Sequence, residues 1–109
     1  MGKERKPVIA PEMHETIRRE ILSRLREGPV SAKELSAGVG IPEKEVAGHL
    51  EHIRKTIAQS GLRLIVTPAE CRKCGFLFAK RERLTKPGKC PVCKSESIHE
   101  PLFAVEPHE

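Results

Sequence analysis

The stretch Cys71-Arg72-Lys73-Cys74 is followed fifteen residues later by Cys90-Pro91-Val92-Cys93, and these two pairs contain all four cysteines of the chain. Pairs of the form Cys-x2-Cys at this separation are typical of a four-thiolate zinc site, because each pair turns tightly enough to aim both sulfurs at one ion. Gly75, directly after the first pair, suits a turn that needs a positive φ. The pattern predicts a zinc ribbon. Its expected ligands are Cys71, Cys74, Cys90 and Cys93.

Disulfides are a weaker interpretation of the same cysteines. They need an oxidising compartment, but the chain opens Met-Gly-Lys-Glu-Arg-Lys-Pro, without the apolar segment of a secretory signal. No later apolar run is long enough to span a membrane. We therefore expect a cytoplasmic protein with free thiols and no membrane partner.

Redox and catalytic roles are the next alternatives. A thioredoxin-like pair expects a strand-helix context and one Cys-x2-Cys rather than two. Iron in the same four-sulfur cage stays open, because tetrahedral sulfur ligands suit zinc and iron alike. The pattern supplies ligands only, and no nucleophile-base pair, nucleotide-binding loop or paired catalytic carboxylates accompany it. We expect one structural metal ion per chain and no enzyme.

The positive charge is concentrated around the cysteine pairs. The 109-residue chain has a formal net charge of +5, and residues 71–94 carry eight of its Lys and Arg against one Glu. Such a segment permits a nucleic-acid partner, because Lys and Arg neutralise phosphates. The alternative is a solvated surface that keeps a small protein soluble.

Two helices are expected after a loose arm at residues 1–10. Apolar residues at intervals of three and four predict the first, from Pro11 to a stop at Gly28-Pro29. Its apolar positions are Met13, Ile17, Ile21, Leu22 and Leu25. The capping-box pattern Ser31-Ala-Lys-Glu34 predicts a short second helix that ends at about Ala37.

A third helix is expected from Pro42 to about Ala58, after a tight turn at Gly38-Val39-Gly40. Its apolar face consists of Val46, Leu50, Ile53 and Ile57. Two helices joined by a short turn that contains glycine are typical of a helix-turn-helix. The β-rich run at residues 62–67 then predicts a strand, and a final run at residues 102–105 predicts its partner.

Residues 35–53 resemble the helix-turn-helix of winged-helix transcription regulators of bacteria and archaea. The matching positions are Leu35, Val39, Gly40, Ile41, Val46, Leu50 and Ile53. Residues 68–103, PAECRKCGFLFAKRERLTKPGKCPVCKSESIHEPLF, closely resemble a small group of predicted transcriptional regulators that fuse a winged helix to a rubredoxin-like zinc ribbon. Lys94 departs from rubredoxin, which has glycine after the second pair. Trp and Tyr are also absent, which favours structural zinc over an electron carrier.

This resemblance implies an α+β fold: a winged helix-turn-helix of three helices and a small antiparallel sheet, with the zinc ribbon inserted at the wing. The expected division is an arm at residues 1–10, the winged helix-turn-helix at 11–67, and the ribbon with a returning C-terminal strand at 68–109.

Candidate DNA contacts lie on the third helix and on the ribbon. The helix is expected to expose positively charged and histidine side chains, although Glu43, Glu45 and Glu51 cancel its basic charge. The ribbon would supply phosphate contacts in the manner of a wing. The candidates are Lys44, His49, His52, Lys55, Arg81, Arg83 and Lys86.

Several other side chains have two interpretations. His49 and His52 are three residues apart on the third helix, close enough to share a metal ion, but exposed histidines are the simpler expectation. His99 is expected on the surface. Phe76, Phe78 and Phe103 suit either a base-stacking platform or the core of the ribbon, and the core is favoured because Phe is usually buried.

Three functions follow from these patterns. The first is a DNA-binding transcriptional regulator with a structural zinc ribbon. Its partner would be double-stranded DNA, which it would bind as a monomer or as a homodimer. The second is an adaptor whose ribbon docks on a protein of the transcription machinery, and the third is a metal-sulfur redox protein.

Overall fold

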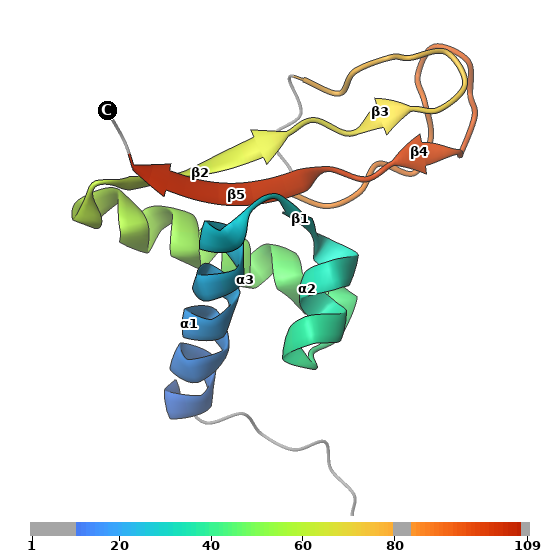
Figure 1. Ribbon diagram of the computed structural model, residues 1–109. Helices are drawn as coiled ribbons and strands as arrows, with labels where there is room; N and C mark the ends of the chain where they lie inside the picture. The colour runs from blue at the N-terminus through green and yellow to red at the C-terminus, as the bar shows by residue number, and fades with distance from the viewer. Residues whose placement is uncertain (1–10, 80–83, 108–109) are drawn as a thin grey trace, which may run out of the picture.

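The computed structural model describes residues 11–79 and 84–107, and within these ranges the chain is an α+β protein (Figure 1). Its helices are α1 (Pro11–Glu27), α2 (Ala32–Val39) and α3 (Glu43–Ile57), and a 3₁₀ turn, η1 (Ala58–Ser60), follows α3. Its strands are β1 (Val30–Ser31), β2 (Leu62–Thr67), β3 (Glu70–Cys71), β4 (Ile98–His99) and β5 (Leu102–Pro107). The expected α+β class is confirmed.

The second helix begins at the predicted capping box. Ser31 Oγ accepts a hydrogen bond from the Glu34 N–H at 3.0 Å, and Glu34 Oε1 accepts one from the Ser31 N–H at 2.9 Å. The helix ends two residues later than expected, because Gly38 remains helical and only Gly40, at φ +83°, adopts the left-handed conformation. The turn to α3 therefore starts at Gly40, and the prediction that it starts at Gly38 is wrong.

Gly38 has a packing role within the helix. A Cβ at this position would lie 2.7 Å from Nη1 of Arg24, whose Nη2 donates a hydrogen bond to the Gly38 carbonyl at 3.1 Å. The absence of a side chain lets the guanidinium of α1 lie against the backbone of α2. This contact ties the first two helices together.

The main sheet has the order β1-β5-β2. β5 pairs antiparallel with β2 along its whole length, from Leu62↔Pro107 to Thr67↔Leu102, as the two runs predicted. It also pairs with β1 through Val30↔Phe103, a strand that the sequence did not reveal. The central strand is therefore the last in sequence, and the sheet cannot form until the chain has returned from the ribbon.

The three helices cover one face of this sheet and enclose the main core (Figure 1). The predicted stripe of α3 is buried throughout, and Leu50 is 0% exposed. Phe103 of β5 is also 0% exposed in this core, so its expected place in the ribbon core is wrong. Met13 does not belong to the apolar face of α1, because it lies near the free end of the helix and is 54% exposed.

Residues 68–79 and 85–101, which lie between β2 and β5 in sequence, form a second, smaller unit. The β3–β4 pair forms its base through Glu70↔His99 and Cys71↔Ile98. Its core includes Ala69 and Ile98, with the rings of Phe76 and Phe78 edge to face at 5.0 Å and packed against it. These two phenylalanines are core residues, as favoured, while His99 is exposed.

Leu84 connects the two units. It lies between the cysteine pairs in sequence, yet it is 5% exposed and belongs to the main core with residues of α1, α2, α3 and β5. The segment that crosses from one cysteine pair to the other is therefore anchored on the helical half of the protein. No periodic pattern surrounds Leu84, and the sequence offered no signal for this contact.

Candidate metal centre and helix surface

The four cysteine sulfurs converge at the end of the ribbon. All lie within 4.8 Å of one another, and the closest pairs are Cys71–Cys93 at 3.5 Å and Cys74–Cys90 at 3.6 Å. A tetrahedral ion bonded to each sulfur at about 2.3 Å would hold the sulfurs about 3.8 Å apart. The separations exceed a disulfide bond, and all four cysteines are free. The cluster fits one zinc ion.

Each cysteine pair forms a turn that is closed by its own backbone. Sγ of Cys71 accepts hydrogen bonds from the N–H groups of Lys73 at 3.4 Å and Cys74 at 3.5 Å. The Gly75 N–H then donates to the carbonyl of Cys71 at 3.0 Å, with Gly75 at the predicted positive φ of +80°. These N–H groups stabilise a thiolate at the first ligand.

The second pair repeats this geometry. Sγ of Cys90 accepts from the N–H groups of Val92 at 3.4 Å and Cys93 at 3.5 Å, and the Lys94 N–H donates to the Cys90 carbonyl at 2.9 Å. Lys94 takes the conformation that Gly75 takes in the first pair, with φ +65°, and is the one non-glycine residue with positive φ in the described chain. Glycine adopts a positive φ without strain, which explains why rubredoxin-like ribbons have glycine at this position.

Burial and charge distinguish the four ligands. Cys71 and Cys90 are buried, while Cys74 and Cys93 are exposed. The Cys74 N–H is the main group that lowers the pKa of Cys71, to about 6. The Phe76 N–H lowers the pKa of Cys74, but partial desolvation of its sulfur and the neighbouring sulfurs outweigh it and raise that pKa to about 12. Four sulfurs this close cannot all ionise without a compensating cation, and a divalent ion supplies that charge.

The donor set is complete without further side chains. Among residues 11–79 and 84–107, no His, Asp or Glu joins the four sulfurs within ligand distance of one ion. Four protein ligands leave no open coordination position, which is the arrangement of structural rather than catalytic zinc. The two turns and the four sulfurs define a zinc ribbon of the rubredoxin type within a small α+β protein.

Comparisons with known proteins agree with this class. Residues 16–65 match the family model described as "PF0610-like, N-terminal", and residues 68–108 match the "PF0610 rubredoxin-like zinc beta-ribbon domain". The chain belongs to the PF0610-like family. It is 34% identical to protein PF0610 from Pyrococcus furiosus, whose solution NMR structure it matches with a TM-score of 0.72 over 95% of this chain and 98% of that chain. No curated protein matches the chain.

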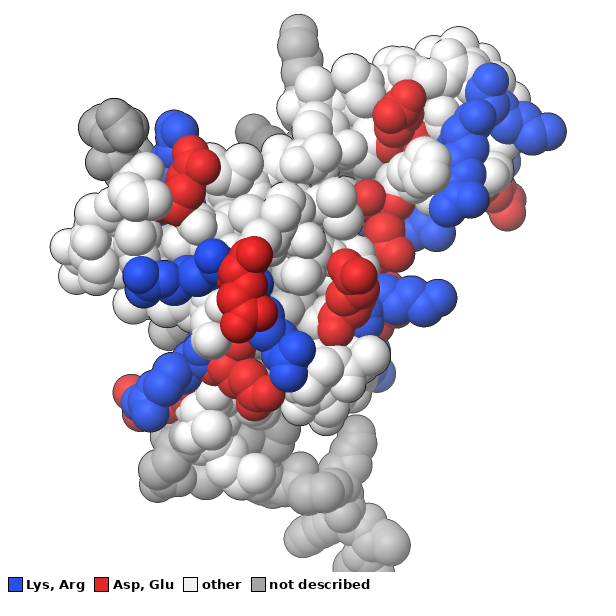
Figure 2. Space-filling model, in the orientation of Figure 1, with Lys and Arg blue, Asp and Glu red and all other residues white. Residues whose placement is uncertain are grey.

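The predicted DNA contacts divide into exposed residues, residues outside the described ranges, and the buried His49. Lys44, His52, Lys55 and Lys86 are exposed, and their role stays a prediction. Arg81 and Arg83 lie outside the described residues. Figure 2 shows Lys, Arg and Glu side chains alternating over the helices in that view, and a run of basic side chains along the right-hand edge of the ribbon.

In the described chain, no helix is long and apolar enough to cross a membrane.

His49 is not a surface residue, and its prediction as an exposed DNA contact is wrong. It is 6% exposed, and its Nδ1 accepts a hydrogen bond from Nε of Arg18 at 3.0 Å. The ring of His14 lies edge-on to it at 5.9 Å. Burial and then the Arg18 charge lower the pKa of His49. The residue lies at the edge of the α3 stripe, one turn after the buried Val46, and Arg18 and His14 of α1 cover that edge.

Proposed function

We propose that this protein is a DNA-binding transcriptional regulator of the winged helix-turn-helix type, with a structural zinc ribbon in the place of the wing. The helix pair α2–α3 carries the proposal. The capped α2 ends at a left-handed Gly40, three residues separate it from α3, and α3 buries one stripe while its opposite side is exposed. These features support a helix-turn-helix, a motif whose second helix enters the major groove.

The ribbon supports the proposal by its position and charge. It is inserted between β2 and β5, the two strands that form the hairpin of a wing in an ordinary winged helix. In the described part of the ribbon five basic side chains are exposed: Arg72, Lys73, Lys86, Lys89 and Lys94. Side chains of this kind bind phosphates of any sequence and hold a reading helix in register.

The metal is proposed to be zinc, held by Cys71, Cys74, Cys90 and Cys93. Structural zinc contributes on the order of 10–16 kcal/mol of apparent binding free energy at neutral pH, which a ribbon with so small a core needs in order to fold. We propose no catalytic activity, because the donor set leaves no open position. Elemental analysis of native protein tests the metal, and iron in place of zinc would favour the redox alternative.

Gel-shift titration on duplex DNA at several salt concentrations tests DNA binding. A site selected from random sequence should bind more tightly than random duplex, and affinity for both should fall as salt rises. Neutralising Arg81, Arg83 and Lys86 together should flatten the slope of log affinity against log salt by about two to three units, because each lost phosphate contact removes about 0.9. The matched control is neutralisation of three exposed basic residues outside the ribbon and the α2–α3 pair, Arg19, Arg26 and Arg63, which should leave the slope nearly unchanged.

A protein-interaction adaptor is the second candidate, and one observation favours it. Leu77 and Val92 of the ribbon are 53% and 63% exposed, although both are large apolar side chains. Apolar groups at an exposed site are suited to burial against a protein partner. A pull-down from native lysate, with and without nuclease, separates the two functions, because capture through DNA is lost after nuclease treatment and capture through protein is not.

A further inference from the structure

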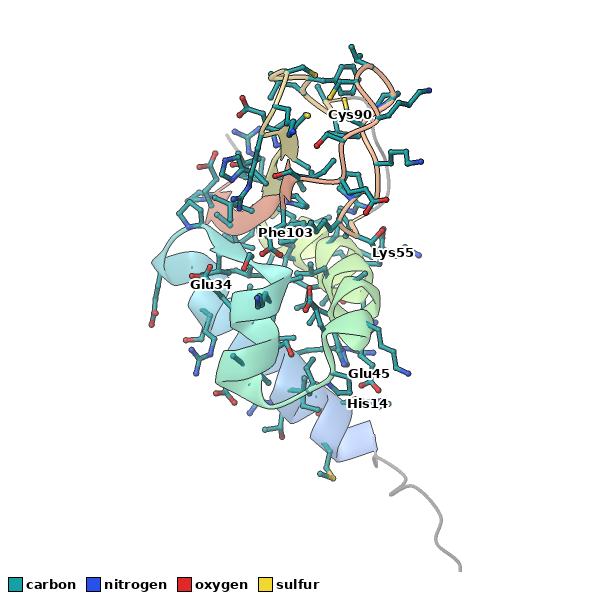
Figure 3. The ribbon with its side chains drawn as sticks, turned by 90° about the vertical axis from the view of Figure 1, so that its right-hand side faces the viewer. His14, Glu34, Glu45, Lys55, Cys90 and Phe103 are labelled. Carbon is teal, nitrogen blue, oxygen red and sulfur yellow. The ribbon has the colours of Figure 1, made fainter. Side chains whose placement is uncertain are left out.

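The outward side of α3 can be defined from its buried side. Val46, Leu50, Ile53 and Ile57 face the core, so the line opposite them faces away from the protein. At about 100° per residue this line passes through Lys44, Gly48 and Lys55, and each lysine lies within about 40° of Gly48 around the helix axis. All three residues are exposed, and Figure 3 shows the Lys55 side chain pointing away from the other helices.

Among residues 11–79 and 84–107, no contact requires glycine at position 48. It lies in the middle of α3, and it is absent from the glycines that adopt a positive φ. A Cβ built there would meet no atom of the described part of the chain within 4 Å. Glycine in an exposed helix interior lowers stability relative to alanine, so the residue weakens the helix without improving its packing.

The charges along this line favour an anionic partner. Lys44 and Lys55 are separated by eleven residues, about 16 Å of helix, with the bare backbone of Gly48 between them. Glu51, the acid nearest the line, is paired with Arg54 at 2.6 Å. The cancellation of charge expected for α3 as a whole therefore does not hold on its outward side, where the two lysines lie on either side of Gly48 and the exposed His52 lies about 40° from it.

We infer that α3 contacts a DNA duplex along Lys44, Gly48 and Lys55, and that Gly48 is its point of closest approach. This inference rests on the proposed function. The two lysines would contact phosphates on either side of the major groove, while the absence of a side chain at Gly48 lets the helix backbone come close to the base edges. Gly48 is thus assigned to DNA recognition rather than to folding.

Gly48→Ala and Gly48→Leu test the assignment by separating stability from binding. Both substitutions should raise the melting temperature, by about 3–8 °C for alanine, because both residues are better helix formers than glycine. Affinity for the selected duplex should fall about tenfold for alanine, the order of loss expected from overpacking a close contact, and further for leucine. The salt slope should stay unchanged, because no phosphate contact is lost.

Ser23→Ala and Ser23→Leu, at an exposed position of α1, are the matched controls. They should leave affinity unchanged. If the wild-type protein binds duplex DNA and the Gly48 variants bind it equally well, the assignment of Gly48 is overturned while the proposed function stands. If the wild-type protein binds no duplex at low salt, the proposed function fails and this inference fails with it.

Discussion

Removal of the metal should destabilise the helical half of the protein as well as the ribbon. The reason is topological, because β5 is the central strand of the main sheet and follows the ribbon in sequence. The connection between Thr67 and Leu102 is 34 residues long. With the metal bound, the ion joins the two cysteine pairs to each other. The part of the connection that remains a free loop then falls to roughly a third of its length.

Two contributions set the size of the effect. Loop-closure entropy scales as 1.5RT ln n, so the longer free loop costs about 1 kcal/mol. Leu84, held between the two pairs, loses its fixed place in the main core, and its burial is worth about 2 kcal/mol. The sum of about 3 kcal/mol should lower the melting temperature of the helices by about 10–20 °C.

The assay is thermal unfolding followed by far-ultraviolet circular dichroism, which reports mainly on the helices. It should be run on zinc-loaded protein, on chelated protein and on Cys90→Ser, with Lys89→Ser as a control at an exposed neighbouring position. Amide hydrogen exchange in α3 would localise the change. If metal is verifiably lost while the helices melt at the original temperature, the two units are independent and the argument is wrong.

Three further predictions concern single side chains. Leu50→Ala should cost about 2–5 kcal/mol, because it leaves a cavity where α3 meets the core, and an unchanged denaturant midpoint would contradict the packing of α3. Lys94→Gly should stabilise the zinc-bound protein by about 1 kcal/mol in thermal melts, since Lys94 occupies a left-handed conformation; a loss of stability would indicate that its side chain has a role. The pKa of His49 is lowered in the folded state, so the unfolded state binds the proton more readily. The contribution of His49 to the free energy of unfolding should therefore be fully present above pH 6.5 and be lost as the pH falls through the folded-state pKa. His49→Gln should lack this part of the pH dependence in thermal melts between about pH 7.5 and 5.

Local sequence determined the metal site and the helices. The two Cys-x2-Cys turns are built from hydrogen bonds between residues two to four apart, such as the Gly75 N–H to the Cys71 carbonyl, so their geometry can be predicted without knowledge of the rest of the fold. The capping box at Ser31 and Glu34 is equally local. The apolar spacing of α3 also predicted its buried stripe, because any helix with that period must bury that side.

The tertiary structure decided the contacts between segments that are distant in sequence. His49 is on the edge of the α3 stripe, and only the position of α1, with Arg18 against it, makes it buried. Phe103 belongs to the helical core because β5 returns to the centre of the main sheet, and Leu84 is buried in the same core although it lies between the two cysteine pairs in sequence. Spacing within one segment sets which residues share a face, whereas the neighbour that covers that face depends on contacts between segments, which no local pattern encodes.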